Sequence, residues 1–248
     1  MKNEKKFNKL FSSVLMGLMV ITIAVTTVFK LEEDNARTFM IIVAALGSVM
    51  GVASSILSAN GLIWTFLFGM LDIVCCCIVD VDNGIWGDFS MHLFYLMPMQ
   101  IVGIWQWRKR GASGSGTEVK ARKLSPRWRW MLLGSVAAGL FLVFGILLAI
   151  KYWTVDPSEI NRVQVFADAA RTTFNIAGQI LMSLAFYEQW YLWILVNVAS
   201  IVLWGSTMLS GAASSYTVVM FIKYCFYLLN SLNGLRIWFK LSKETGEA

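Results

Sequence analysis

Long apolar runs follow one another along the chain, and short polar stretches separate them. A helix that crosses a bilayer needs about 20 consecutive, mostly apolar residues. Eight segments come to about that length, and four of them carry no Asp, Glu, Lys, Arg or His. The pattern therefore predicts an all-α polytopic membrane protein, with helices at 10–29, 38–57, 61–79, 89–107, 130–150, 163–186, 189–209 and 215–239.

The composition supports a membrane protein and excludes several other classes of protein and of site. Hydrophobic residues make up 57% of the chain and charged residues 15%, against about 45–50% and about 25% in soluble domains. The single histidine, His92, excludes a multi-histidine metal site, and the adjacent cysteines at 75–77 have neither zinc nor disulfide spacing. The chain shows no Gly-rich phosphate loop and no clear nucleophile–base pair. We therefore expect neither an enzyme nor an ATP-driven pump, and we predict no cofactor and no metal.

Basic residues gather in three places, and their positions predict an orientation. The net charge of +6 comes mostly from the N-terminal tail and the loop at 108–129 (the basic loop), so it reflects membrane topology and does not indicate nucleic-acid binding. With eight spans, the tail, the basic loop and the C-terminal end fall on one side. The acid-rich loops at 30–37, 80–88 and 155–161 fall on the other. We therefore expect both termini in the cytoplasm (N-in, C-in), and the Gly/Ser-rich start of the basic loop predicts a flexible connection.

Two stretches of the chain resemble each other. LFYLMPMQIVGIWQWRK at 93–109 and CFYLLNSLNGLRIWFK at 225–240 each place Phe-Tyr-Leu about a dozen residues before aromatic residues and a lysine. The preceding helices each hold an early tryptophan, Trp64 and Trp193, at a similar offset. This predicts two parallel three-helix repeats joined by a linker helix, a 3+1+3 plan that SWEET transporters use, plus one extra N-terminal helix.

The predicted division of the chain follows from that plan. The extra helix has no evident role within the repeats, and packing between subunits of a homo-oligomer is one open role for it. The parts are 1–37 for the tail, extra helix and external loop, 38–107 for the first repeat, 108–152 for the basic loop and linker helix, 153–240 for the second repeat and 241–248 for the C-terminal tail.

Polar side chains recur at helical spacing within the last three predicted spans. Such stripes either enclose a ligand cavity or hold helices together. Aromatic faces paired with amides suit a flat heteroaromatic ligand, and a cationic ring would gain from cation–π attraction. The stripes are Asp168, Thr172, Asn175 and Gln179, then Trp190, Trp193 and Asn197, then Lys223, Tyr227, Asn230 and Gly234.

Tryptophans also gather at membrane interfaces, so each one has a second reading. Trp190 starts a span and fits either the interface or the site, whereas Trp193 lies a turn deeper, on one face with Asn197. The tryptophans expected at the interface are Trp86, Trp107, Trp128, Trp130, Trp153 and Trp238.

Three stretches together resemble the PnuC family of vitamin transporters. They are AGQILMSLAFYEQWYLWILVNVASIVLW at 177–204, GIWGDFSMHLFYLMPMQIVGIWQW at 84–107 and YLLNSLNG at 227–234. The resemblance implies a SWEET-like 3+1+3 fold and uptake of nicotinamide riboside across a bacterial inner membrane by facilitated diffusion, with trapping by cytosolic phosphorylation. Matching motif positions imply these substrate-binding residues: Gln100, Thr173, Gln179, Trp190, Trp193, Asn197, Tyr227 and Asn230.

Within that implied site, Trp193 would stack on the pyridinium ring, and Gln179 and Asn197 would bond the carboxamide or the ribose. Because Thr172 and Thr173 are adjacent, only one of the two is expected to face inward. The phosphorylated mononucleotide is not an expected substrate, since no basic cluster lies in the spans.

Several alternatives stay open at this point. Thiamine and riboflavin also have flat rings, so a related vitamin transporter fits the pattern, and so does a membrane-embedded ligand sensor without flux. Proton coupling is a further possibility, through Asp72, Asp168 or His92.

Overall fold

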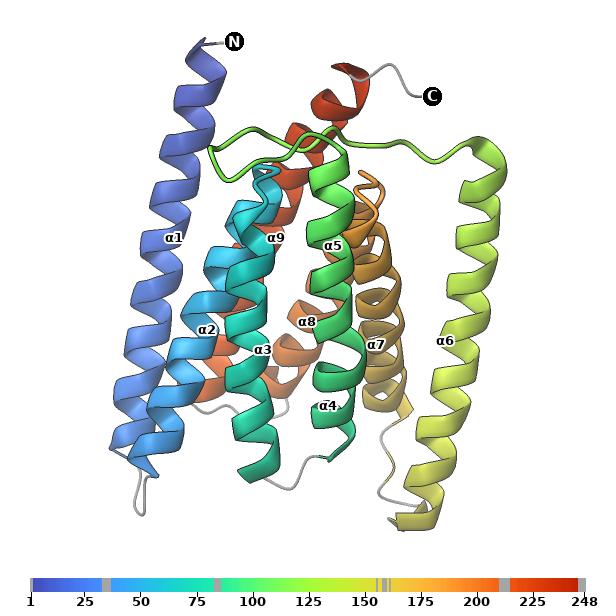
Figure 1. Cartoon of the computed structure of the whole chain (residues 1–248). Helices are drawn as coiled ribbons and strands as arrows, with labels where there is room; N and C mark the ends of the chain where they lie inside the picture. The colour runs from blue at the N-terminus through green and yellow to red at the C-terminus, as the bar shows by residue number, and fades with distance from the viewer. Residues whose placement is uncertain are drawn as a thin grey trace.

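The described residues of the computed structural model form a bundle of long helices (Figure 1). The structure describes residues 2–32, 37–82, 86–154, 156, 157, 160, 162–209 and 215–244. Parts of the acid-rich loops and the last four residues lie outside these ranges. The helices are α1 (Lys2–Leu31), α2 (Thr38–Ala59), α3 (Trp64–Asp82), α4 (Trp86–Met91), the π-helical turn η1 (His92–Leu96), α5 (Met97–Lys109), α6 (Pro126–Thr154), α7 (Arg162–Ser183), α8 (Gln189–Leu209) and α9 (Ser215–Glu244).

The described helices confirm an all-α polytopic membrane protein. By length and apolar composition, four helical segments can cross a membrane: Lys6–Leu31, Thr38–Ala59, Trp64–Asp82 and Pro126–Thr154. The long helices α7, α8 and α9 coincide with the last three predicted spans; the part of α8 at Gln189–Gly205 is apolar but shorter, and α7 and α9 carry more polar side chains. The predicted tail before residue 10 is instead a continuation of α1, which begins at Lys2.

A π-helical turn interrupts the fourth predicted span. The N–H of Met97 donates to the carbonyl of His92, five residues earlier, and Pro98 follows at the start of α5. Proline has no N–H to donate, which removes the normal bond to a carbonyl four residues back. The local register shift to five-residue bonds accommodates that loss. The π-helical turn therefore lies directly before Pro98.

Helices from the two predicted halves pack against each other crosswise. The first helix of one half, α2, contacts the last helix of the other, α9, and α7 likewise contacts α5. Within the halves, α2 packs on α3 and α3 on α5, just as α7 packs on α8 and α8 on α9. Figure 1 shows the start of α1 and the end of α9 at the same end of the bundle.

The two helices outside the predicted repeats sit differently. Helix α1 lies against α2 and α9 and buries Leu15, Met19 and Ile23 there. Asn60, directly after α2, donates from Nδ2 to the hydroxyl of Ser12 in α1. Helix α6 packs mainly on α7 and buries none of its residues, and Figure 1 shows it at the edge of the bundle.

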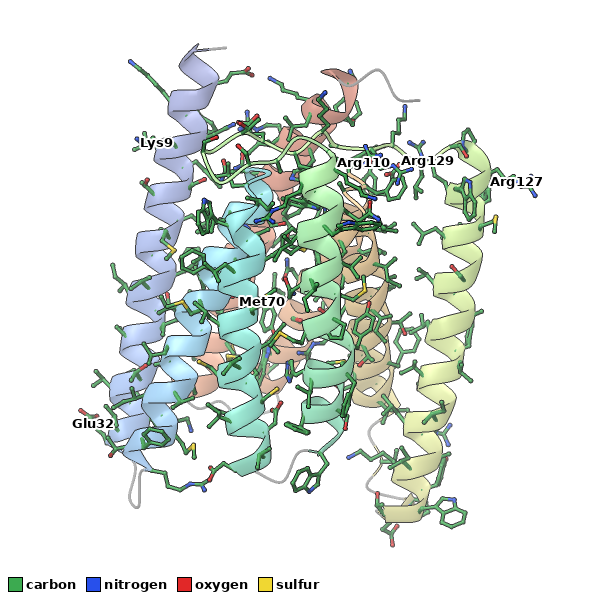
Figure 2. The ribbon with its side chains drawn as sticks, viewed as in Figure 1. Lys9, Glu32, Met70, Arg110, Arg127 and Arg129 are labelled. Carbon is green, nitrogen blue, oxygen red and sulfur yellow. The ribbon has the colours of Figure 1, made fainter. Side chains whose placement is uncertain are left out.

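Basic and acidic side chains lie toward opposite ends. Figure 2 shows Lys9, Arg110, Arg127 and Arg129 near the end that holds the basic loop, and Glu32 near the other. We call these the basic end and the acidic end.

The basic loop is ordered, so the expectation of a flexible connection is wrong for its second part. Val119 and Ala121 are fully buried, at 1% and 0% exposure. The N–H of Val119 donates to Gly61 O (2.9 Å) in the α2–α3 turn, and that of Arg122 donates to Ala185 O (2.7 Å) in the α7–α8 turn. The loop therefore joins two turns that are 124 positions apart in the sequence, at Gly61 and Ala185. Both of these residues have a positive φ, 69° for Gly61 and 61° for Ala185. Glycine tolerates that conformation, while Ala185 is held in it by these backbone bonds.

Candidate functional site

Four aromatic rings from four helices close the basic end. We call Phe66, Trp107, Trp190 and Trp238 the aromatic cluster; their exposures are 0%, 0%, 2% and 0%. The ring centroids form a chain, with Phe66–Trp107 at 4.8 Å, Trp107–Trp238 at 5.3 Å and Trp190–Trp238 at 6.3 Å. Buried loop residues Val119 and Ala121 pack on the same cluster. The rings and the loop together form a packed core at this end.

The expected interfacial position is wrong for Trp107 and Trp238. Trp107 Nε1 donates to Met182 O at the end of α7, and Trp238 Nε1 donates to Ser58 O at the end of α2, each at 2.8 Å. A buried indole N–H needs an acceptor, and the last carbonyls of a helix lack intrahelical partners. Each tryptophan thus satisfies a helix end in the opposite half of the chain. By contrast, the tryptophans expected at the interface that are well exposed are Trp86, Trp128, Trp130 and Trp153.

Two glycines allow the rings to approach the third helix of each half. A Cβ on Gly103 would lie 2.1 Å from Phe66 Cε1, and one on Gly234 would lie 2.6 Å from Trp190 Cη2. No side chain fits at such distances, so both positions require glycine. Trp190 is therefore a packed residue of the aromatic cluster, and its interfacial reading is wrong.

A layer of buried amides lies beneath the aromatic cluster. Asn197 Nδ2 donates to Ser231 Oγ at 2.9 Å, joining α8 to α9. Asn230 Nδ2 donates to Ser55 O (3.1 Å) and Ser55 Oγ (2.7 Å), joining α9 to α2. Asn197 and Asn230 are 7% and 1% exposed. Since Asn197 follows Trp190 by seven residues, the layer lies about 10 Å along the helix from the rings.

Gln100 belongs to the same layer on the first-half side. It is 6% exposed, and its Oε1 would be 2.9 Å from a Cβ on Gly69, which Ser54 Oγ also approaches at 3.3 Å. Ser54 adjoins Ser55, the acceptor of Asn230. Gln100 thus lies beside Ser54, next to the serine that Asn230 bonds, and we call Gln100, Asn197 and Asn230 the amide layer.

Trp193 and Gln179 lie along the α7–α8 contact. The Trp193 indole packs on Gly178, where a Cβ would be 3.3 Å from the ring, and its Nε1 donates to Gln189 Oε1 at 3.4 Å. Gln179 Nε2 donates to Ser183 Oγ (3.3 Å), and Ser183 Oγ donates to Met99 O of α5 (3.0 Å). Trp193 is half-buried, so the protein leaves part of this side chain uncovered.

Two predicted residues have neighbours other than the amide layer. Thr173 is buried where Thr172 is not, but its methyl approaches Gly139 of α6, so it faces the linker helix. Tyr227 packs against the buried residues shared by α1 and α2 and lies beside Tyr224, with ring centroids 6.2 Å apart. The structure thus places three of the predicted residues in the amide layer and Trp190 in the aromatic cluster, whereas Thr173 and Tyr227 have other neighbours.

Several buried polar atoms near the cluster have no hydrogen-bond partner in the described part of the chain. They include Gln100 Oε1, Gln189 Nε2 and Trp190 Nε1. An unsatisfied buried donor or acceptor costs about 1–3 kcal/mol. A polar ligand that offered matching groups would recover that cost, and these atoms present both donors and acceptors.

The three groups considered for proton coupling lie at separate places. His92 Nδ1 is 2.6 Å from Asp80 Oδ2, and Asp168 Oδ1 is 3.7 Å from Arg171 Nη1. Asp72 instead lies against α2, where a Cβ on Gly51 would be 2.7 Å from its Oδ2. None of the three has a recorded bond to the amide layer among the described residues.

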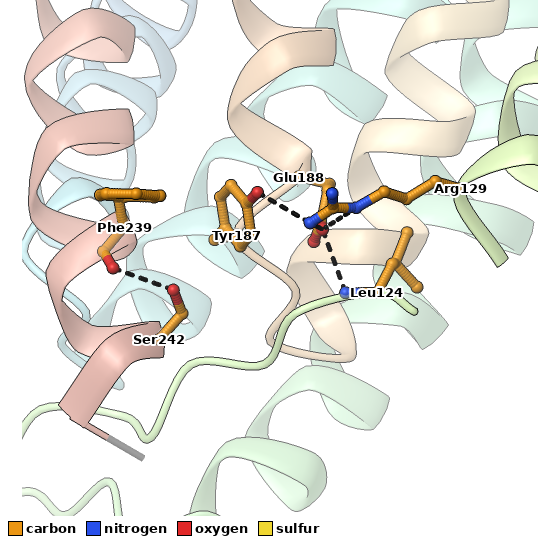
Figure 3. A network of polar contacts seen from close by, with 6 residues as sticks. All are labelled: Leu124, Arg129, Tyr187, Glu188, Phe239 and Ser242. Carbon is orange, nitrogen blue, oxygen red and sulfur yellow. Dashed lines mark hydrogen bonds and ion pairs between the residues drawn. The ribbon is translucent and has the colours of Figure 1, made fainter. Parts of the chain in front are cut away.

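The sequence did not predict the polar network at the basic end, although Glu188 lies within the stretch at 177–204 that resembles the PnuC family. Glu188 Oε1 accepts from Leu124 N (3.0 Å) and from Arg129 Nε and Nη2 (3.2 and 3.1 Å), and Arg129 Nη2 also reaches Tyr187 Oη (3.0 Å; Figure 3). Burial raises the pKa of Glu188 above its ordinary value, although Leu124 N–H and Arg129 act against that shift. The network fixes the start of α6 and the loop to the α7–α8 turn. Its partners are about 60 residues away, which sequence spacing does not reveal.

Comparison with known proteins places this arrangement in a family. The family described as "Nicotinamide mononucleotide transporter" matches residues 41–240. The chain belongs to that family. The matched range includes every residue of the aromatic cluster and the amide layer and leaves out all of α1.

Curated relatives match most of this chain at modest identity. It is 31% identical to the nicotinamide riboside transporter PnuC of Neisseria mucosa, over 81% of this chain and 73% of the relative. It is 28% identical to PnuC of Haemophilus influenzae, over 82% and 81%, and 24% identical to PnuC of Escherichia coli, over 82% and 87%. A solved structure, described as the crystal structure of the vitamin B3 transporter PnuC, matches with a TM-score of 0.66 at 26% identity, covering 96% of this chain and 93% of that one.

Proposed function

We propose that this protein carries nicotinamide riboside across the inner membrane of a bacterium by facilitated diffusion, with trapping by cytosolic phosphorylation. The observation that supports this most directly is the buried amide layer beneath a packed aromatic cluster, in a chain whose curated relatives are named nicotinamide riboside transporters. Amides can bond a carboxamide and ribose hydroxyls, and the half-buried Trp193 ring can stack on a flat cation. We propose Gln100, Gln179, Trp190, Trp193, Asn197, Tyr227 and Asn230 as binding residues, with Thr173 retained as the weakest member.

The chemistry of the site favours the nucleoside over the mononucleotide named in the family description. All the proposed binding residues are uncharged at neutral pH, and the side-chain amides of Asn197 and Asn230 donate to serines. A phosphate normally requires basic side chains or a helix N-terminus to offset its charge. Nicotinamide riboside needs neither, so it is the proposed substrate.

We further propose that the chain is built as a 3+1+3 pair of parallel repeats with both termini in the cytoplasm. Paired contacts support the repeats. Trp107 bonds Met182 O while Trp238 bonds Ser58 O, and Gly103 receives Phe66 while Gly234 receives Trp190. These contacts support Phe66 as the first-half counterpart of Trp190, in place of the predicted pairing of Trp64 with Trp193.

The separation of charge supports the orientation. The basic loop, the start of α1 and the end of α9 lie at one end of the bundle, and an excess of Lys and Arg marks the cytoplasmic side. On this proposal the aromatic cluster and the basic loop close the cytoplasmic end. Release of the riboside then requires the cluster to part.

Uptake into liposomes that contain the purified protein tests the proposal. Labelled nicotinamide riboside should equilibrate across the bilayer without an ion gradient, and unlabelled riboside should compete better than thiamine, riboflavin or the mononucleotide. Trp193→Ala and Asn197→Ala should abolish uptake. Trp153→Ala, at a 91% exposed position, is the matched control and should transport normally.

Other outcomes would contradict specific parts. Saturable binding of the riboside without flux indicates a sensor. Stronger competition by thiamine or riboflavin indicates another vitamin. Normal uptake by both Trp193→Ala and Asn197→Ala, each folded as judged by gel filtration, shows that the site is elsewhere. Accumulation that depends on a pH gradient removes facilitated diffusion.

A further inference from the structure

A groove of about 750 Å³ lies between the start of α6, the loop residues before it and the end of α7. It belongs neither to the aromatic cluster nor to the amide layer. Its polar part includes Arg122 and Lys123 beside Trp128, and its wall includes Met131 and Ile180.

The groove opens toward the surroundings of the bundle and not toward its interior. Helix α6 buries none of its residues, and it packs mainly on α7. Met131 is 50% exposed and Ile180 39% exposed. In a membrane protein, an apolar wall exposed in this way meets lipid chains.

The groove also spans the level at which a bilayer changes from polar to apolar. Trp128 and Trp130 are 59% and 73% exposed, and such tryptophans sit at the headgroup level. The lining runs from Ser125 to Ser135, which is about 15 Å along a helix. That length covers a headgroup region and the first part of the acyl chains.

The charged part of the groove is held in place. Arg122 N donates to Ala185 O at 2.7 Å, and Tyr187 N donates to Arg122 O at 3.0 Å. The Arg122 guanidinium carbon lies 4.4 Å from the centroid of the Phe186 ring. Two adjacent basic residues at headgroup level, one of them fixed by backbone bonds and a ring, complement a phosphate.

From these observations we propose that the groove binds one anionic phospholipid of the surrounding bilayer. Its phosphate lies between Arg122 and Lys123, and an acyl chain lies along Met131 and Ile180. Basic pockets between helices on the cytoplasmic side bind anionic headgroups in general. The loop segment that carries both basic residues also joins the α7–α8 turn, so the lipid stabilises that junction.

Native mass spectrometry of the full-length protein in detergent tests this proposal. Phosphatidylglycerol should bind as one retained molecule, and phosphatidylcholine with the same chains should bind much more weakly. Because each basic residue near an anionic headgroup contributes about 1 kcal/mol, R122Q together with K123Q should weaken phosphatidylglycerol about 30-fold. Lys109→Gln, a basic residue at the same end but outside the lining, should bind it as the unaltered protein does.

A second pair of variants tests the apolar wall without changing charge. Ile180→Trp should fill the groove and reduce phosphatidylglycerol binding. Leu133→Trp, at a 59% exposed position of α6 outside the lining, should leave it unchanged. A thermal shift with phosphatidylglycerol that R122Q together with K123Q removes would support the same conclusion.

Four results would overturn the proposal. One is equal retention of phosphatidylglycerol and phosphatidylcholine. Another is normal binding by both the charge and the wall variants. A third is displacement of the signal by millimolar inorganic phosphate with no effect of Ile180→Trp, which would mean a free-anion site. The fourth is a cross-link from Met131 to another copy of the chain, which would mean a subunit interface. None of these outcomes depends on the transported substrate.

Discussion

Replacing Trp238 by phenylalanine tests whether the aromatic cluster holds the two halves together. The change removes the bond from Nε1 to Ser58 O and leaves a smaller ring in a fully buried site. Ser58 O still accepts from Gly61 N at 2.9 Å, so the lost bond costs the ordinary net value of about 1 kcal/mol. The void adds about 1 kcal/mol, taking about 24 cal/mol per Å³ and a phenyl ring about 40 Å³ smaller than indole.

The expected loss is therefore about 2 kcal/mol in the free energy of unfolding. Trp107→Phe should cost about the same, because Met182 O likewise keeps a bond from Ala185 N, at 3.0 Å. Unfolding by sodium dodecyl sulfate in mixed micelles measures both values. The exposed control Trp153→Phe should change stability by less than about 0.5 kcal/mol.

The double variant adds a sharper test. The two ring centroids are 5.3 Å apart, and such aromatic pairs contribute about 0.5–1.5 kcal/mol beyond area burial. The double variant should therefore cost less than the sum of the single ones. Strict additivity, or a loss below about 0.5 kcal/mol for either single change, would refute the packing described for the cluster.

Three further changes have expected outcomes. Gly234→Ala places a methyl 2.6 Å from the Trp190 ring, so it should lower the free energy of unfolding by about 1–3 kcal/mol and slow riboside uptake. Gly17→Ala is its control, because nothing lies within 4 Å of a Cβ at that position. Equal melting and uptake of the two variants would contradict the contact. Gly61→Ala, at φ 69°, should lower stability by about 1 kcal/mol in the same micelle titration, and an unchanged value would show that the turn relaxes. Because burial raises the pKa of Glu188, the neutral carboxyl is favoured on folding, so its contribution to stability is present at low pH and is lost as the pH rises through the raised pKa. In Glu188→Gln, the free energy of unfolding should depend less on pH in that window above pH 4.5. An unaltered pH profile would contradict the raised pKa of Glu188.

Much of the helical framework is predictable, since it depends on local pattern. The predicted start and end of the span at 189–209 coincide with α8, and the predicted start at residue 38 coincides with that of α2. The positions of Asn197 and Asn230 on inward faces also follow from helical spacing, and both are buried. Ser55 and Ser231, the acceptors of those amides, were missed because a lone serine in an apolar helix is usually bonded within its own helix.

Local sequence pattern did not predict the position of a side chain that suits two environments equally well. A tryptophan near a helix end fits the bilayer interface or a protein interior equally well by composition. Thr172 and Thr173 differ by about 100° around one helix, and contact with α6 decides which of them is buried. The Gly/Ser-rich start of the basic loop suggested freedom, but backbone bonds to two turns order the loop.

The sequence alone determined the helices, the separation of charge and the chemistry of the polar faces, because hydrophobic periodicity and charge placement act over a few turns. Only the tertiary structure decided which rings close the basic end and which carbonyls they bond. The deciding contacts join positions 75 and 180 residues apart, Trp107 to Met182 and Trp238 to Ser58. Such contacts depend on how the helices are placed against one another, and no local pattern specifies that placement.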